Sequence, residues 1–141
     1  MNPQTGVQRV VSQGGYLKSP QAIAVSGNDI YVTDVATQDG NFGIGRIVHV
    51  DGQTGRQTVV STGGYLVGPV GIALDGNGQL VVGDPYTVNP QSRDIADGGY
   101  DGAIIRIEPL TGTQTLLARG QAGYLNPRGV TVVWNSTAGN R

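Results

Sequence analysis

Two aspartates hold equivalent places in the chain, each directly after a short apolar run. Asp34 follows residues 30–33, and Asp84 follows residues 80–83. As a pair they could present carboxylates to a ligand, or each could accept backbone N–H groups and organise the following loop. A catalytic residue need occur only once, so recurrence in register favours the structural role. The residues expected to turn or cap the chain in this way are Asp34, Asp84, Gly63, Gly64 and Pro69.

Other residue types that carry chemistry are scarce. The single histidine, His49, aligns with Arg106 of a second repeat, which disfavours a role as general base or zinc ligand. One histidine cannot supply a Ser-His-Asp set or a multi-histidine metal site, and the absence of cysteine excludes disulfides. The segment from Asp75 to Gln79 looks like the start of a calcium loop but lacks the later glycine and acidic residue of an EF-hand. We therefore expect no catalytic residue, no metal ligand and no cofactor.

The longest irregularity is the loop of residues 85–102, which is seven residues longer than its counterpart, residues 35–45. If the strands of each repeat are lettered A to D, the B–C and D–A loops of an antiparallel meander emerge at one end. Insertions on one face of a repeat array mark its binding face, and Tyr and Arg anchor interfaces. Alternatively, the tyrosines pack between repeats and the loop is a tolerated insert. The predicted binding residues are Tyr86, Arg93, Asp94, Asp97, Tyr100, Asp101, Tyr16, Tyr65 and Tyr124.

Charge and composition argue against several classes of partner. Nine basic and ten acidic residues are well mixed, which argues against a nucleic-acid or anionic-membrane surface. No apolar run approaches the ~20 residues needed to cross a bilayer. Residues 1–11 lack the basic and then apolar pattern of a signal peptide. We expect a soluble chain, and its compartment stays open.

An internal repeat supplies the elements that must position these residues. Thr-Gly pairs, prolines and tyrosines recur with spacings of 49 and then 57, 58 or 59 residues. A period of about fifty residues suits a four-stranded propeller blade. Short β-branched runs between Gly, Pro, Asn and Asp fit four strands per period, and helical spacing is lacking. The expected strands are residues 22–25, 30–33, 46–50 and 57–60, then 71–74, 80–83, 103–107 and 114–117, with single strands at 8–11 and 129–133.

The predicted fold is all-β: a β-propeller segment of four-stranded antiparallel blades with a period of about 49–58 residues. Residues 1–12 hold the outer strand D of a preceding blade, and residues 127–134 hold strand A of a following one. Complete blades occupy residues 20–61 and 69–118. Because a propeller closes with four to eight blades, the chain alone cannot close a ring. We expect either a homo-oligomer that completes the propeller or the remaining blades of a longer chain.

The segment from Pro69 to Asp84 resembles the NHL repeat: a proline, a glycine, an apolar triplet, a Gly-Asn turn and a strand that ends in Asp. Residues 20–34 are similar. The resemblance implies a propeller whose relatives bind proteins, RNA or ligands or, in gluconolactonase-like cousins, hydrolyse small substrates at a metal in the central channel. The usual Asn and Arg after the strand-ending aspartate are replaced here, at residues 35–37 and 85–87. Kelch propellers are an alternative, but their Gly-Gly doublet follows the second strand, whereas here it precedes the first.

These observations favour a non-catalytic binding or scaffolding module that uses the end formed by the B–C and D–A loops. The partner would be a protein or a small-molecule ligand. One alternative is a fragment of a metal-dependent gluconolactonase-like hydrolase or related lyase, and another is a purely structural repeat unit. A repeat fold does not by itself imply an activity, so the sequence favours a non-enzyme without naming a ligand.

Overall fold

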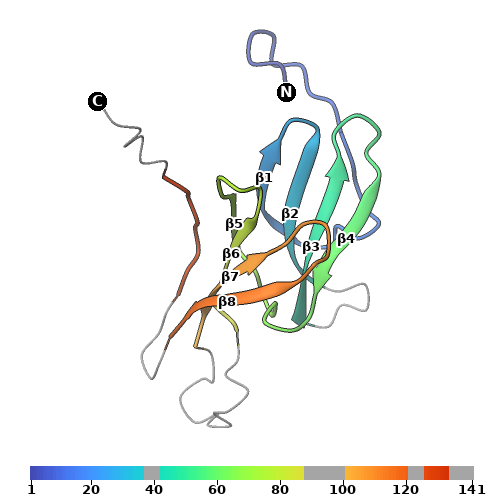
Figure 1. The fold of residues 1–141 in the computed structure, drawn as a ribbon. Helices are drawn as coiled ribbons and strands as arrows, with labels where there is room; N and C mark the ends of the chain where they lie inside the picture. Colours follow the sequence, from blue (N-terminus) through green and yellow to red (C-terminus); the bar gives the residue numbers. More distant parts are fainter. Residues whose placement is uncertain (37–41, 88–100, 121–125, 134–141) are drawn as a thin grey trace, which may run out of the picture.

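The computed structural model describes residues 1–36, 42–87, 101–120 and 126–133 (Figure 1). These residues form two four-stranded antiparallel sheets and include no helix, so the fold is all-β as predicted. Within this part of the chain we find no helix with the length and apolar character required to span a bilayer. The strands of the first sheet are β1 (Pro20–Ser26), β2 (Asp29–Ala36), β3 (Phe42–Asp51) and β4 (Gln57–Thr62). Those of the second are β5 (Gly71–Leu74), β6 (Leu80–Asp84), β7 (Ala103–Ile107) and β8 (Gln114–Arg119).

Each sheet is a simple meander in which every strand pairs with the next one along the chain. Tight turns make this possible, because consecutive strands are joined at one end by short segments rich in Gly and Asp. In the turn from β3 to β4, Asp51 Oδ1 accepts the N–H groups of Gln53 and Thr54 at 2.9 and 2.8 Å. Gly55 closes the same turn in the left-handed region, at φ +73°. A side chain there would also clash, since a Cβ would lie 2.2 Å from the carbonyl oxygen of Val11.

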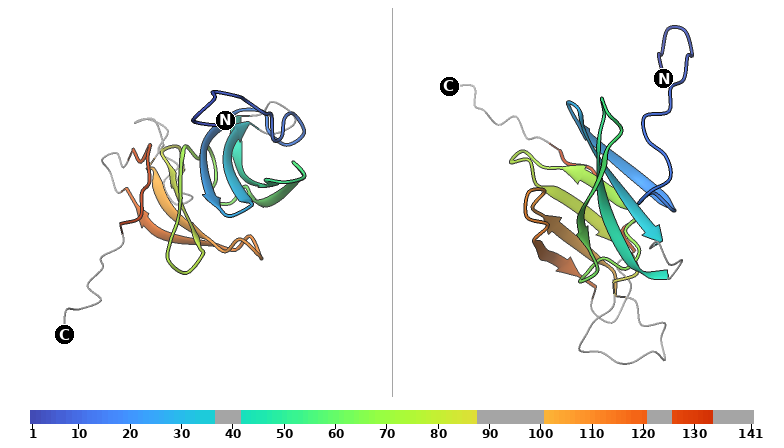
Figure 2. Two further views of the ribbon diagram at one scale, coloured as in Figure 1. Left: turned by 90° about the horizontal axis from the view of Figure 1, so that it is seen from above. Right: turned by 90° about the vertical axis from the view of Figure 1, so that its right-hand side faces the viewer.

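The two sheets pack face to face, and residue register tells which faces meet (Figure 2). We call one side of each sheet its front face. It carries Ile23, Val25, Ile30, Val32, Val48 and Val50 in the first sheet and Ile72, Leu74, Leu80, Val82, Ile105 and Ile107 in the second. The front face of the second sheet packs on the opposite, rear face of the first sheet, which carries Ala22, Ala24, Tyr31 and Ile47. The small alanines leave room for the large aliphatic side chains.

The front face of the first sheet is covered differently. Val32, Val48 and Val50 are buried there, with Leu17 of the N-terminal segment packed against them. Ile23 and Val25 on β1 stay 60% and 57% exposed. Among the residues that the structure describes, the first sheet therefore has a sheet on its rear face and a chain segment on its front face.

The two terminal stretches differ from the expected single strands. The structure assigns no strand to residues 8–11 or to residues 129–133. A strand is defined by pairing with a neighbour, and the described residues include no neighbour for either stretch. Residues 127–130 nevertheless lie against the rear face of the second sheet, where a Cβ on Gly83 would be 3.0 Å from the carbonyl oxygen of Pro127. The assignment of the two ends to half-blades stays a prediction.

Candidate functional site

The loop that leads into the second sheet and the chain that leaves β6 lie together at one end of the molecule, the lower end in Figure 1. We call this region the loop end and define it as residues 12–19, 62–70, 85–87 and 101–102. It is the end to which the sequence assigned the B–C and D–A loops.

Asp84 holds the loop end of the second sheet together. Its carboxylate is buried and accepts the N–H groups of Val67 at 2.7 Å, of Gly68 at 3.0 Å and of Tyr86 at 2.9 Å. Two of these donors precede β5, so the carboxylate ties the entering loop to the strand that leaves. The sequence predicted that such an aspartate would organise the loop after it. In the structure the loop before β5 supplies most of these N–H groups.

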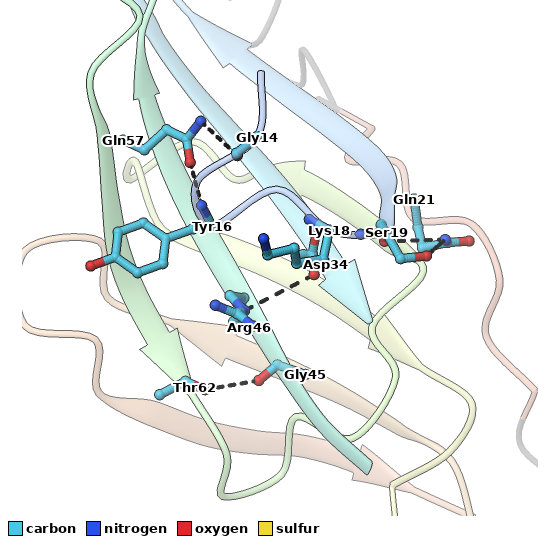
Figure 3. A network of polar contacts seen from close by, with 10 residues as sticks. All are labelled: Gly14, Tyr16, Lys18, Ser19, Gln21, Asp34, Gly45, Arg46, Gln57 and Thr62. Carbon is cyan, nitrogen blue, oxygen red and sulfur yellow. Dashed lines mark hydrogen bonds and ion pairs between the residues drawn. The ribbon is translucent and has the colours of Figure 1, made fainter. Parts of the chain in front are cut away.

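Asp34 has the same place in the first sheet (Figure 3). Its Oδ2 accepts the N–H groups of Lys18 and Ser19 at 2.7 and 2.9 Å. A cation accompanies it: Arg46 Nε lies 4.0 Å from Asp34 Oδ1, and the two side chains are 6% and 0% exposed. In the second sheet the residue that pairs with Asp84 on the neighbouring strand is Ala103, so no arginine stands there.

Burial has an electrostatic consequence for Asp84. Loss of solvent raises the pKa of the Asp84 carboxyl above its usual value, and the hydrogen bonds from backbone N–H groups oppose that rise without cancelling it. The group is nevertheless poorly placed for chemistry on a ligand, because its oxygen atoms are engaged by the backbone and closed off from solvent. Asp34 is equally buried. Both aspartates are therefore supports for the loop end.

The base of the long loop is rigidly built. Thr87 is buried and donates its hydroxyl hydrogen to the carbonyl oxygen of Tyr65 at 2.8 Å. Where the chain returns, the N–H of Asp101 reaches the carbonyl oxygen of Thr87 at 3.1 Å. Tyr86 lies on Gly68, where a Cβ would be only 2.6 Å from the ring, so this close approach requires a glycine. The entering loop and both stems of the long loop thus form one hydrogen-bonded unit.

The predicted binding residues divide into those that the structure describes and those that lie outside the described residues. Tyr65 and Tyr86 are half-buried and come together in the unit around Thr87, with half-buried Asp101 at its edge. Tyr16 is 37% exposed and belongs to the corresponding loop of the first sheet. Outside the described residues lie Arg93, Asp94, Asp97, Tyr100 and Tyr124.

Sequence reasoning missed two glutamines that join one repeat to the next. Gln114, at the start of β8, accepts the N–H of Tyr65 at 2.9 Å and donates to Ser61 Oγ and to the carbonyl oxygen of Gly63, both at 2.9 Å. Gly64 must be a glycine here, since its φ is +60° and a Cβ would lie 2.7 Å from Gln114 Oε1. We call this arrangement the glutamine clamp.

Gln57 makes the same clamp one repeat earlier (Figure 3). It accepts the N–H of Tyr16 at 2.7 Å and donates to Ser12 Oγ at 2.8 Å and to the carbonyl oxygen of Gly14 at 3.1 Å. A signal was present in the sequence. Glutamine follows each Thr-Gly pair by two residues, at Gln8, Gln57 and Gln114, with the repeat's own spacing of 49 and 57.

The remaining predicted structural residues also lie at the loop end. Gly63 has a φ of +66° and accepts from the Gln114 clamp. Pro69 is fully buried and packs so closely on Gly45 of β3 that a Cβ on that glycine would lie 2.2 Å from its ring. The proline thus fixes the distance between the loop and the first sheet.

His49 lies on the rear face of the first sheet, near the end of β3. Its Nε2 lies 2.7 Å from Asp29 Oδ1, and its ring is tilted against that of Tyr31 at a centroid distance of 5.3 Å. Arg106, which holds the same register position in the second sheet, pairs with Asp75 at 3.6 Å. In both repeats this register position therefore holds a basic residue that contacts an aspartate. Over the described ranges, we find no group of three His, Cys, Asp or Glu side chains placed to hold a metal ion.

Comparisons with known proteins place this fold. No protein-family model matches the chain, and no curated protein matches it significantly. A chain from the crystal structure of a nidogen/laminin complex is 26% identical with a TM-score of 0.54, over 80% of this chain and 36% of that one. The PQQ-bound aldose sugar dehydrogenase of Streptomyces coelicolor is 23% identical with a TM-score of 0.53, over 81% and 33%. The periplasmic gluconolactonase of Pseudomonas aeruginosa is 16% identical with a TM-score of 0.43, over 78% and 31%.

The first two of these neighbours are β-propeller proteins, and this chain spans about a third of the length of each of them. The two sheets are accordingly blades, and the chain is a propeller repeat module.

Proposed function

We propose that this chain is an NHL-like propeller module with a non-catalytic binding role, and that its loop end receives a protein partner. The observation that carries the proposal is the rigid base of the long loop. Asp84, Thr87 and Gly68 fix the backbone around Tyr65 and Tyr86 through buried hydrogen bonds and close packing. A base of this kind presents side chains at a low entropic cost of binding.

The sequence of residues 85–102 has the chemistry of a protein interface. Tyrosines and an arginine are the side chains most often found to dominate binding energy, and residues 85–102 supply Tyr86, Arg93 and Tyr100. Carboxylates from Asp94, Asp97 and Asp101 would suit a partner with basic groups. A matched structure comes from a complex of two proteins, nidogen and laminin, which is in line with a protein partner.

A metal-dependent hydrolase is less well supported. Such a site needs several carboxylate or amide oxygens that converge on a metal from different blades. The two aspartates that share a register, Asp34 and Asp84, instead accept backbone N–H groups at 2.7–3.2 Å and are closed off from solvent. No observation in the described residues favours this second function.

Peptide selection tests the proposal without a known partner. A displayed library of cyclic random peptides is enriched on the whole chain, and the enriched peptides are then measured on two triple variants. The first variant changes the loop end: Tyr86→Ala, Arg93→Ala and Tyr100→Ala. The second is a matched control at residues beside the β1–β2 and β7–β8 turns: Tyr31→Ala, Arg106→Ala and Leu110→Ala.

We expect the enriched peptides to lose at least about tenfold in affinity on the loop-end variant and to keep their affinity on the control, because interface energy is concentrated in a few anchors. Circular dichroism would verify that both variants keep their β-sheet signal. Peptides that bind the two variants alike would refute the proposal.

A further inference from the structure

In the described part of the chain, the front face of the first sheet is only partly covered. The residues at equivalent positions of the second sheet are Ile72 and Leu80. They are 6% and 0% exposed because the first sheet covers them. Ile23 is 60% exposed, although it corresponds to Ile72. Beside it lies an apolar hollow of about 340 Å³ lined by Val11, Leu17, Pro20, Ile23, Ile30 and Val32. The same side chains that are core residues in one sheet are left partly uncovered in the other.

The N-terminal segment already occupies one strand position beside this face (Figure 2). Ser12 Oγ donates to the carbonyl oxygen of Gly55 at 2.8 Å, as Ser61 Oγ at the end of β4 does to that of Gly112 at 2.8 Å. The backbones also approach each other equally closely in both places. A Cβ on Gly55 would lie 2.2 Å from the carbonyl oxygen of Val11, and a Cβ on Gly112 would lie 2.2 Å from that of Val60. Together with the Gln57 clamp, these contacts put residues 8–12 where β4 stands relative to the second sheet.

We propose that the front face of the first sheet is a docking surface for three antiparallel β-strands that complete a blade whose outer strand is residues 8–12. The partner sheet would pair its third strand with residues 8–12 and lay a small-residue face on Ile23, Val25 and Ile30. The face that accepts this pattern inside the molecule, the rear face of the first sheet, has Ala22 and Ala24 on its first strand. The occupant therefore has the chemistry of the A, B and C strands of another repeat of this kind.

A second intact copy of the chain fits this surface less well. Its second sheet carries its own fourth strand, β8, paired along β7. That strand would compete with residues 8–12 for one position. Residues 127–130 also lie against the rear face of its second sheet, at Gly71 and Gly83. Strands that lack a fourth partner meet neither obstacle.

A chain extended at its start tests the proposal. Residues 20–50 are added directly before Asn2, because Asn2–Gly6 repeats the Asp51–Gly55 turn, including the N–H of the glycine donating to the first carbonyl oxygen at 2.8 Å. We expect hydrogen exchange of residues 8–12 and of Ile23 and Val25 to slow by about tenfold or more, since burial of even one aliphatic side chain is equivalent to such a factor. The control extension carries lysine in place of the alanines that correspond to Ala22 and Ala24, and it should give no protection.

Exchange in the second sheet serves as the internal reference for folding. If that sheet stays protected while residues 8–12 exchange equally fast with and without the extension, the proposal is wrong. Light scattering on the unextended chain provides a second test. A stable dimer that Ile23→Asp dissociates would assign the surface to a second copy and would also overturn the proposal.

Discussion

Both sheets use a buried aspartate to hold the loop before the first strand, but the residues beside that aspartate differ. In each, an aspartate at the end of the second strand accepts N–H groups from the loop before the first strand. In the first sheet Arg46 accompanies the buried carboxylate, whereas in the second the corresponding neighbour is Ala103. The two sheets therefore share the hydrogen bonds from backbone N–H groups to the aspartate. They differ in whether an arginine lies beside the carboxylate.

Removal of the cap in the first sheet should have the largest effect. Asp34→Ala leaves two N–H groups without their carboxylate and Arg46 without its buried counter-charge, which we expect to lower the free energy of unfolding by about 3–5 kcal/mol. Arg46→Ala alone copies the pairing of Asp84 with Ala103 in the second sheet, and the double variant Asp34→Ala/Arg46→Ala should recover part of the loss seen in Asp34→Ala. Urea unfolding of the two single variants and the double variant measures the coupling. Strict additivity would show that the two side chains act independently.

The two glutamine clamps should differ next. Gln114→Ala breaks a clamp between two complete sheets, so we expect a loss of about 2 kcal/mol in global stability. Gln57→Ala breaks the corresponding clamp on the N-terminal segment, which can detach while both sheets stay folded. It should change the unfolding midpoint less but speed proteolytic cleavage within residues 1–16. Equal losses of global stability in the two variants would contradict this distinction.

The pH dependence of stability should distinguish Asp84, whose pKa is raised by folding, from Asp51, whose pKa is lowered. Burial raises the folded-state pKa of Asp84, so its contribution is fully present below its unfolded pKa of about 3.9 and is lost as the pH rises through the folded pKa. Hydrogen bonds from Thr54 and Gln53 lower the pKa of Asp51, so its contribution is present above about pH 3.9 and is lost as the pH falls through the folded pKa.

Asp84→Asn and Asp51→Asn should therefore give differences from the wild type that slope in opposite directions. Urea midpoints between about pH 3 and pH 7 provide the measurement. A difference for Asp84→Asn that is independent of pH would mean that its carboxyl titrates alike in the folded and unfolded states.

The smallest effects should come from loss of the contacts of His49 with Asp29 and of Arg106 with Asp75. Asp29, the partner of His49, is 58% exposed, and Arg106, the partner of Asp75, is 45% exposed. Exposed pairs contribute at most about 1 kcal/mol, so His49→Ala and Arg106→Ala should each shift the thermal midpoint only slightly. A loss in either that approaches the Gln114→Ala value would show that one repeat depends on its pair more than exposure implies.

The sequence predicted the strands well because β-branched runs and Gly-Asp turns are local signals. Strands β5 and β7 have the predicted bounds, Gly71–Leu74 and Ala103–Ile107. Others extend further than predicted: Ala36 belongs to β2 because it pairs with Phe42 across the sheet, which no propensity indicates. Residues 8–11 were predicted to form a strand because they include two valines, but the structure assigns no strand to them.

The site was harder to predict because its contacts join distant parts of the chain. The pattern gave Asp34 and Asp84 a capping role, but four of the five N–H groups that they bind lie 15–17 residues upstream. The structural role of the tyrosine positions could be predicted only in part. Glutamines 41 and 49 residues away hydrogen-bond to the backbone of Tyr16 and Tyr65. Periodicity finds such positions, whereas only coordinates show which of them touch.

The glutamine clamp also bears on how such a chain can grow. Each clamp joins the start of a fourth strand, β4 or β8, to a Ser-x-Gly-Gly-Tyr segment one period earlier, so no repeat contains both halves of its own clamp. If a stretch one period long is duplicated in tandem, every new copy brings a glutamine for its predecessor and a Ser-x-Gly-Gly-Tyr segment for its successor. Lengthening by whole periods therefore preserves this contact without any compensating substitution, whereas an insertion of any other length between the two halves separates them.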